Sequence, residues 1–374
     1  MSWIILFVFT IGIAIAYVNG ANDVSKGIAT LVGSGVTNLR RAVLWGTLWT
    51  GIGGVTAAFL AHAMLQTFGK GLLGQGVHAT LGPAVAMIAG AALWIGFATR
   101  KGLPVSTTHG IVGSVTGVAS VAYGLHGVNW SALGSKIFLP LLLSPIASLL
   151  LTAALIRISR LLVPDPATDC MCFKVTQPRI AEVGGSVARL TMIAAPQIHL
   201  ESCASSSRSQ SATGITVNHL HWLTSGATSF ARALNDTPKM AALVLGAVAL
   251  SRTGVQGAMT YFIAITAGML AGSWFAGRKV TEVLADKITC MDHREGFLAN
   301  LVTATLVGPG AALGLPMSTT HVASGGIMGV AAGRGTGINR KTVRDMVLAW
   351  VVTLPAAALF GVLVLFVVRA AGLR

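Results

Sequence analysis

The chain has 374 residues, of which 53% are hydrophobic and only 10% are charged, and its mean hydropathy is +0.75. These values exclude an ordinary soluble domain and predict a polytopic membrane protein. The net charge of +15 would suggest nucleic-acid binding in a soluble protein, but lysine and arginine gather here in short loops between apolar runs, as topology signals do. We therefore expect a protein embedded in a lipid membrane, with no nucleic-acid partner.

Ten apolar runs are long enough to form membrane-crossing helices, since a crossing takes about 20 residues. In chain order they cover residues 3–36, 42–65, 81–98, 103–122 and 137–156 in the first half, and 215–250, 259–276, 297–313, 315–332 and 343–368 in the second. Polar residues interrupt the first run of each half, which gives 10–12 transmembrane segments if these runs are re-entrant. Five segments per half is an odd number, so the second copy inserts upside down. The predicted fold class is an all-α polytopic membrane protein with two inverted-topology repeats and broken or re-entrant helices.

The charges of the loops predict the orientation. Basic residues are frequent in the loops expected inside, such as Arg40 and Arg41. The loops expected outside hold only Lys70, Lys136 and Arg252. By the positive-inside rule, both termini lie outside and the protein is a multi-pass protein of the cell inner (plasma) membrane.

Three regions follow from this reading. Residues 1–163 form the first transmembrane repeat, 164–214 a cytoplasmic linker, and 215–374 the second, inverted repeat. The linker is polar and rich in Ser, Thr and Cys, and its Ser-rich stretch has too little apolar content to bury. The spacing of the four cysteines matches no standard zinc pattern, so we expect no metal and no cofactor.

An Asn-Asp peptide occurs twice in strongly apolar surroundings, as Asn22-Asp23 and as Asn235-Asp236. Polar groups left without partners are costly there, so the matched pair indicates a site rather than two capping turns at the membrane edge. Pro238 follows the second copy, and proline favours the first turn of a helix. We expect each segment to break and restart here, because the free N–H groups and positive dipole of a helix start favour an anion.

A second repeated peptide, Gly-Leu-Pro-x-Ser-Thr-Thr-His, ends at His109 and again at His321. Its first serine follows the Asn-Asp peptide by 84 positions in the first half and 83 in the second. The hydroxyl-bearing residues are Ser106, Thr107, Thr108, Ser318, Thr319 and Thr320. Hydroxyls can bind an oxyanion without a net charge to desolvate, and their lone pairs can equally coordinate a small hard cation. The two histidines are either packed residues or proton carriers.

Lys26 and Lys239 lie three residues after Asp23 and Asp236, on the same helical face as each Asn-Asp pair. A lone lysine deep in a bilayer costs about 2.5–3.5 kcal/mol, but an adjacent aspartate cancels the charge. Two lysines and two aspartates would leave the empty site roughly neutral. The alternative is that each lysine snorkels to an interface.

These peptides resemble the signature of the inorganic phosphate transporter (PiT) family, also known as phosphate permeases. The family carries Gly-Ala-Asn-Asp early and Gly-x-Pro-x-Ser-Thr/Ser-Thr-His later in each half, which correspond here to 20–23, 233–236, 102–109 and 314–321. The second copy departs from the pattern, since Leu234 replaces its glycine-alanine entry. The resemblance implies secondary transport of phosphate with Na⁺ or H⁺ around a central site, and it suggests a homodimer.

The resemblance and the lysine spacing together give the expected site. The substrate-binding residues would be Asn22, Asp23, Lys26, Ser106, Thr107, Thr108, Asn235, Asp236, Lys239, Ser318, Thr319 and Thr320. The candidates for ion coupling are Asp23, Asp236, His109 and His321. The family pattern has small or amide residues where Ser25 and Lys26 stand. We therefore hypothesise that Lys26 or Lys239 replaces one bound Na⁺ and favours H⁺ coupling.

Three other functions compete with phosphate import. Helix ends and hydroxyls do not identify the oxyanion, so a permease for sulfate or another oxyanion is the main alternative. An anion channel is less supported, because the polar residues cluster at matched places instead of lining a continuous pore. No nucleophile or metal motif accompanies the carboxylates, so the protein is not expected to be an enzyme.

Overall fold

The computed structural model describes residues 3–69, 71–162, 170–174, 181–183, 186–188, 197–201, 214–251, 257–335 and 337–373. Helices follow the same order in both halves. The first half contains α1 (Trp3–Gly33), α2 (Leu39–Leu60), α3 (His62–Gly69), α4 (Leu81–Arg100), α5 (Thr107–Tyr123) and α7 (Leu139–Leu162), with η1 (Leu125–Gly127), α6 (Trp130–Ala132) and η2 (Leu133–Phe138) leading into α7. The second contains α8 (Val217–Leu250), α9 (Ala258–Ala276), α10 (Arg278–Asp286), α11 (His293–Ala312), α12 (Thr319–Arg334) and α13 (Arg340–Ala370). Each of the ten predicted segments corresponds to one long helix, whereas the short helices α3 and α10 were not predicted.

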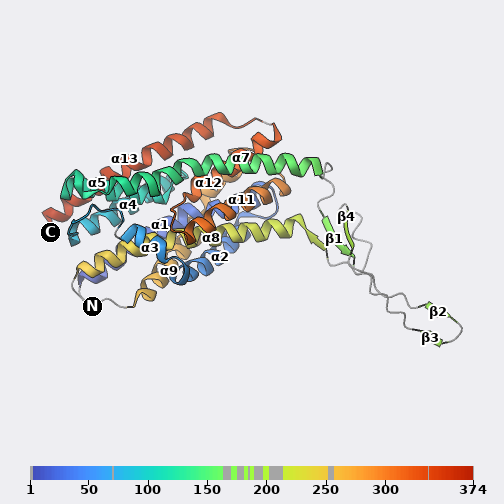
Figure 1. Cartoon of the computed structure of the whole chain (residues 1–374), viewed down its shortest axis with the longest axis horizontal. Helices are drawn as coiled ribbons and strands as arrows, with labels where there is room; N and C mark the ends of the chain where they lie inside the picture. The colour runs from blue at the N-terminus through green and yellow to red at the C-terminus, as the bar shows by residue number, and fades with distance from the viewer. Residues whose placement is uncertain are drawn as a thin grey trace.

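Among the described residues, five short strands lie between α7 and α8, and the first four of them fall within the predicted linker. They are β1 (Cys170–Lys174), β2 (Ala181–Val183), β3 (Ser186–Ala188), β4 (Gln197–Glu201) and β5 (Gly214–Thr216). β1 pairs antiparallel with both β4 and β5, and β2 pairs antiparallel with β3. Figure 1 shows these strands beyond one end of the helix bundle, while both chain termini lie at the other end.

Helices in matching positions of the two halves run in opposite directions. Figure 1 shows α1 leading away from the N-terminus, while α8 starts beside the strands and runs back. In the same way α7 leads toward the strands and α13 returns to the C-terminus. This is the arrangement that two upside-down copies produce.

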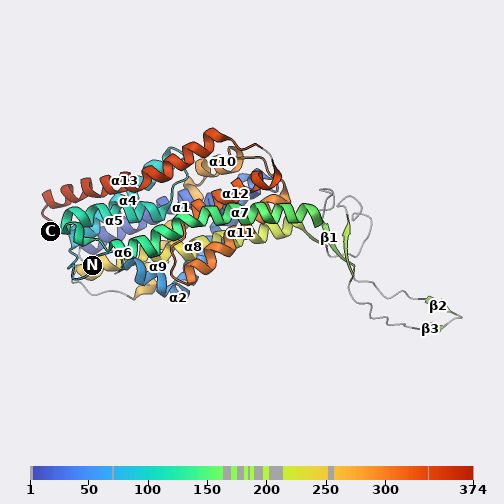
Figure 2. The same ribbon diagram turned by 45° about the horizontal axis from the view of Figure 1, so that its top comes forward.

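The helix pairs α4–α5 and α11–α12 form two hairpins that enter the bundle from opposite ends. Gly102 and Gly314 close the turns after α4 and α11 with φ of +73° and +72°, a conformation that favours glycine. The hydroxyl of Tyr123, at the end of α5, accepts a hydrogen bond from the backbone N–H of Thr80, just before α4. Figure 2 shows α5 at the end that carries the termini and α12 nearer the strands.

Among the described residues, six helical runs are long and apolar enough to cross a membrane. They are α1, α2, α4, the run Trp130–Leu162 that includes α7, α9 and α13. The hairpin arms α5 and α12 have 17 and 16 residues, which is short for a full crossing. The prediction of an all-α polytopic membrane fold is confirmed for the helical bundle, whereas the first run of each half, which was expected to be broken or re-entrant, is a continuous helix.

The predicted breaks at the Asn-Asp peptides are wrong. α1 continues through Asn22 and Asp23, and α8 continues through Asn235, Asp236 and Pro238. Proline in a helix interior removes one backbone hydrogen bond, but α8 packs against α1, α2, α3 and α11, and Pro238 is buried. The polar side chains find partners across the bundle, so the backbone need not unwind to satisfy them. The helix starts expected here are supplied instead by α5 and α12.

The first helix packs against α9 at very short distance. A Cβ atom on Gly20 would lie 2.0 Å from the Met269 carbonyl oxygen, and one on Gly272 would lie 1.8 Å from the Tyr17 carbonyl oxygen. Real side chains do not tolerate such distances, so glycine is required on both helices. This contact fixes the turn of α1 that carries the first Asn-Asp peptide.

Candidate functional site

The two Ser-Thr-Thr-His peptides each start a helix. Ser106 accepts a hydrogen bond from the His109 backbone N–H at 3.2 Å, and Ser318 accepts one from the His321 backbone N–H at 3.2 Å. Such a serine cap satisfies one of the free N–H groups of the first turn. Each helix begins at the residue after the serine, not at the preceding proline. Two positive helix ends are thereby available for a negative charge.

The tips of the two hairpins touch each other. The Thr320 hydroxyl donates to the Val105 carbonyl oxygen at 2.8 Å. The rings of His109 and His321 have centroids 4.7 Å apart. The starts of α5 and α12 therefore meet, although they belong to different halves of the chain.

In α1, the side chains of the first Asn-Asp peptide are buried and form hydrogen bonds. Lys26 Nζ donates to Asp23 Oδ1 at 2.7 Å and to Asn22 Oδ1 at 2.6 Å. The Asn22 amide donates to Thr99 Oγ1 at 2.9 Å and to the Leu103 carbonyl oxygen at 3.0 Å. Lys26 is 1% exposed, so it does not snorkel to an interface. Asn22 thus ties α1 to the first hairpin, and Lys26 forms an ion pair with Asp23.

In α8, the second peptide makes an equivalent set of contacts. Lys239 Nζ donates to Asp236 Oδ1 at 3.0 Å and to Thr108 Oγ1 at 2.8 Å. The Asn235 amide donates to the Met317 carbonyl oxygen at 2.9 Å. Lys239 is fully buried and is paired with its aspartate, as the sequence spacing predicts. Through Thr108, this half of the site reaches the hairpin of the other half.

Asn19, which the sequence analysis missed, connects the two halves. Its side-chain amide lies 2.9 Å from Thr107 Oγ1, 3.2 Å from Asp236 Oδ2 and 3.4 Å from Asp23 Oδ2. Its carbonyl oxygen accepts a hydrogen bond from Arg232 at 3.4 Å. One amide therefore contacts both aspartates, one hairpin hydroxyl and one arginine.

Arg232 is the second residue that was missed, and it is 0% exposed. Besides Asn19, it donates to the Thr50 hydroxyl of α2, while its Nε has no partner. The repeat contained a signal for both missed residues, since Asn19 and Arg232 stand three positions before Asn22 and Asn235.

The buried cluster is positively charged when its groups are ionised. It contains three cations, Lys26, Lys239 and Arg232, and two carboxylates, Asp23 and Asp236. The excess is one positive charge, whereas the sequence predicted a neutral site. Three cations, two helix starts and a set of hydroxyls make this region suited to an anion.

The remaining predicted residues lie beside this cluster. Thr319 is buried at the start of α12. His109 and His321 face a cavity of about 440 Å³ between α7 and α13, where the His321 ring centroid is 4.1 Å from that of Trp350. His109 Nδ1 and His321 Nε2 have no hydrogen-bond partner. The histidines therefore lie at the hairpin tips, on the side that faces α7 and α13.

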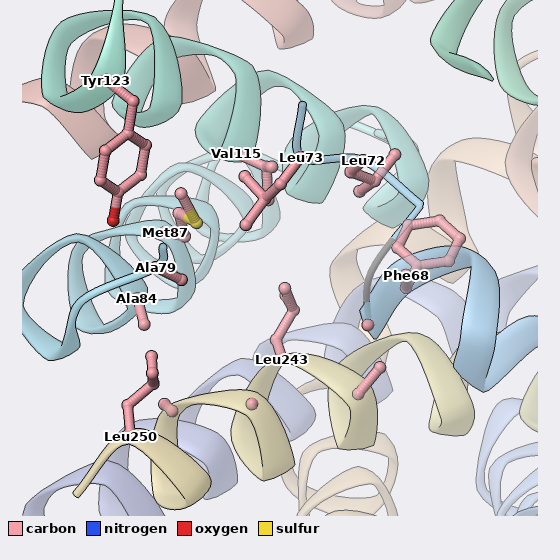
Figure 3. A pocket seen from close by; sticks show the side chains of 14 residues that line it. Phe68, Leu72, Leu73, Ala79, Ala84, Met87, Val115, Tyr123, Leu243 and Leu250 are labelled. Atoms are coloured by element: carbon pink, nitrogen blue, oxygen red, sulfur yellow. The ribbon is translucent and has the colours of Figure 1, made fainter. Parts of the chain in front are cut away.

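A second cavity approaches the charged cluster from the end that carries the termini. It has a volume of about 210 Å³ and lies between α3, α4, α5 and α8. Figure 3 shows Leu243 of α8 facing Val115 of α5 across it, with Tyr123 at one end and Phe68 at the other. Lys239 Nζ lies 5.8 Å from the centroid of the Phe68 ring. Phe68 thus borders both the cavity and the charged cluster.

No group of three or more His, Cys, Asp or Glu side chains suited to a metal ion occurs among the residues that the structure describes. The polar groups at the centre are instead amides, hydroxyls, lysines, one arginine and two carboxylates. Such a set can bind an oxyanion through its donors and a small cation through its carboxylates.

Comparison with known proteins agrees with this arrangement. A protein of Pyrococcus abyssi named as a phosphate permease is 27% identical over 397 aligned residues, which cover 97% of this chain and 97% of that protein. A Haemophilus influenzae protein with the same kind of name is 28% identical over 414 residues, covering 98% and 97%. A solved structure called the sodium-dependent phosphate transporter superimposes with a TM-score of 0.78 and 24% identity, covering 99% of this chain and 100% of the other. At this identity the structural likeness shows the fold alone.

The family assignment comes from the sequence profile. The profile described as the phosphate transporter family matches residues 19–361, a range that contains both copies of both peptides. This family comprises transporters, not enzymes. The chain belongs to the phosphate transporter family and is a multi-pass membrane protein.

Proposed function

We propose that this protein imports inorganic phosphate by secondary active transport, with alternating access to one central site. The observation that carries the proposal is the meeting of both copies of both peptides in one buried cluster. Asn19 and Thr108 link the copies directly, since each bonds a residue of the other half. A site shared by two inverted repeats can be opened to either side when one repeat moves against the other.

The chemistry of the cluster favours a tetrahedral oxyanion. Phosphate oxygens accept hydrogen bonds from hydroxyls, amides, ammonium groups and helix N–H groups, all of which converge here. We assign substrate binding to the predicted Asn, Lys, Ser and Thr residues of the repeated peptides. The two aspartates can accept the protons of a phosphate hydroxyl, which sulfate lacks at neutral pH. Phosphate is therefore preferred over sulfate in this proposal.

The apolar cavity beside Phe68 is the proposed start of the route from the side of the termini. In the described conformation the charged groups bond one another behind Phe68, so the site is closed on that side. Transport requires the α4–α5 hairpin or α3 to move away from α8. The membrane orientation in this proposal is the predicted one, with the termini outside and the linker in the cytoplasm.

Import of phosphate into a negatively charged interior needs a coupling cation. Moving one negative charge inward against 100 mV costs about 2.3 kcal/mol, and a dianion costs roughly twice that. We propose Na⁺ or H⁺ as the coupling ion, with Asp23 and Asp236 as its first candidates and His109 and His321 as further ones. The name of the sodium-dependent structural relative supports Na⁺. The homodimer that the resemblance suggests stays a prediction.

Uptake of ³²P-phosphate by the purified protein in proteoliposomes tests this function. The Na⁺ gradient and the pH gradient are imposed separately, with empty liposomes as the control. We expect uptake that one of the two gradients accelerates, with weak competition by sulfate. Uptake of sulfate without uptake of phosphate would assign the protein to another oxyanion, and unitary currents in a planar bilayer would contradict a transporter mechanism.

A further inference from the structure

The excess positive charge of the central cluster can be attributed to one residue. Lys26 forms an ion pair with Asp23 at 2.7 Å, and Lys239 forms one with Asp236 at 3.0 Å. Each lysine therefore has its own carboxylate. In the part of the chain that the structure describes, Arg232 hydrogen-bonds only neutral groups, Asn19 and Thr50. The unbalanced charge thus belongs to Arg232 and not to either lysine.

An arginine in this position is unusual because it cannot become neutral. A guanidinium stays protonated in proteins, whereas a buried lysine can release its proton. Arg232 is 0% exposed near the middle of a 34-residue helix, so it cannot reach an aqueous interface. A charge held at membrane depth is expensive and in membrane proteins marks an ion or substrate pathway. Its Nε has no hydrogen-bond partner. Among the described residues, the anions whose charge acts on it are Asp23 and Asp236, and each of these already pairs with a lysine.

The network around Asn19 connects Arg232 to the proposed phosphate site. The Asn19 carbonyl oxygen accepts from Arg232, and the same side-chain amide lies within hydrogen-bonding distance of Thr107 and Asp236. Only Asn19 lies between the Arg232 guanidinium and the proposed site. Because the dielectric constant of the buried cluster is low, the electrostatic attraction between the guanidinium and an anion bound there is strong. Arg232 need not touch the substrate to balance its charge.

We propose that Arg232 is the fixed counter-ion for the first negative charge of the transported oxyanion, so that phosphate binds before any coupling cation. This inference rests on the proposed function and specifies its binding order. It replaces the hypothesis that a lysine substitutes for one Na⁺. A monoanion is balanced by Arg232 alone, and a dianion needs only one further cation in the loaded site.

Equilibrium binding of ³²P-phosphate to the detergent-purified protein tests the proposal. Binding is measured in choline chloride at pH 7, with and without added Na⁺. We expect the wild-type protein to bind phosphate in choline. Arg232→Gln is expected to lose roughly tenfold in affinity, about 1.4 kcal/mol, and to regain most of it when Na⁺ is added. Arg232→Lys keeps the charge and is expected to bind in choline.

The matched control is Arg278→Gln, because Arg278 is an exposed arginine that pairs with Glu282 on α10. It should bind phosphate like the wild type in both buffers. If Arg232→Gln behaves in the same way, with unchanged affinity and unchanged Na⁺ dependence, the inference is wrong. If the wild-type protein binds no phosphate in either buffer, the proposed function fails instead.

Arg232→Met keeps the test decisive if Arg232→Gln does not fold, because replacing a buried charge by an apolar side chain of similar length is often tolerated. Like Arg232→Gln, it should bind phosphate weakly in choline and regain most of its affinity when Na⁺ is added. Wild-type affinity of Arg232→Met in choline would contradict the charge-balance argument.

Discussion

The side-chain amide of Asn19 lies 3.2 Å from the carboxylate of Asp236, although 217 positions separate them in the chain. Asn19 belongs to α1 and Asp236 to α8, the matching first helices of the two halves. Because α1 and α8 run in opposite directions, this contact joins the two copies at the centre of the bundle (Figure 1). If one half of the protein moves against the other, the Asn19–Asp236 hydrogen bond must either move with α1 and α8 together or break.

Replacing Asn19 by leucine keeps the size of the side chain but removes every polar contact. A buried polar group that loses its partner costs about 1–3 kcal/mol, and here Arg232 and Asp236 both lose one. We expect phosphate uptake by Asn19→Leu to fall roughly tenfold or more. The control is Asn129→Leu, which removes only a helix cap at α6. Equal uptake by both variants would show that Asn19 does not connect the halves functionally.

The close packing of α1 and α9 gives a prediction about stability. A Cβ on Gly272 would lie 1.8 Å from the Tyr17 carbonyl oxygen, whereas one on Gly246 would meet no atom within 4 Å. Gly272→Ala must push the helices apart, and such overpacking costs about 1–3 kcal/mol. We expect a lower Tm in detergent for Gly272→Ala and an unchanged or slightly higher Tm for Gly246→Ala. A Tm for Gly272→Ala equal to that of the wild type would contradict the packing described for α1.

The buried carboxylate of Glu295 holds the second hairpin at its open end. Glu295 is 3% exposed and contacts Arg160 of α7 at 3.0 Å and Arg334 of α12 at 3.3 Å. Glu295→Gln removes the charge that both arginines share and should lower the Tm. Glu282→Gln is the control, since its pair with Arg278 is exposed and exposed pairs contribute little. A lower Tm for Glu282→Gln than for Glu295→Gln would refute this role of Glu295.

Thiol labelling tests the predicted orientation. Cys290 is exposed beside the start of α11, and Leu250 ends α8 at the cavity on the side of the termini. One variant keeps Cys290 as its sole cysteine, and a second has Leu250→Cys as its sole cysteine. With a membrane-impermeant maleimide on intact cells, we expect labelling of the Leu250→Cys variant alone. Labelling of Cys290 alone would reverse the orientation.

Much of the fold followed from the sequence, because the thickness of the bilayer sets the length of the apolar runs. The hairpin tips were not predicted, because residues 103–122 and 315–332 were expected to cross the membrane. The signal was present, since Ser106 and Ser318 are strong helix-capping residues followed by apolar helices. The short helices were missed. α10, for example, is a polar surface helix without a membrane-length apolar run.

The centre of the site was predicted less well. The sequence signals of Asn22, Asp23 and Pro238 favour a helix break when only local contacts are considered. The structure keeps both helices continuous because partners such as Thr99 and Thr107 come from distant segments. Tertiary contacts of this kind cannot be read from local propensity.

The most direct test of the central site is phosphate uptake by proteoliposomes that contain the wild-type protein, Asp23→Asn or Asp236→Asn. Each substitution removes one carboxylate but keeps its shape, so insertion and a single size-exclusion peak are expected for both variants. If phosphate and its coupling ion bind at the shared cluster, the wild type transports phosphate and both variants lose nearly all uptake. Near-normal uptake by both variants would contradict the assignment of the site.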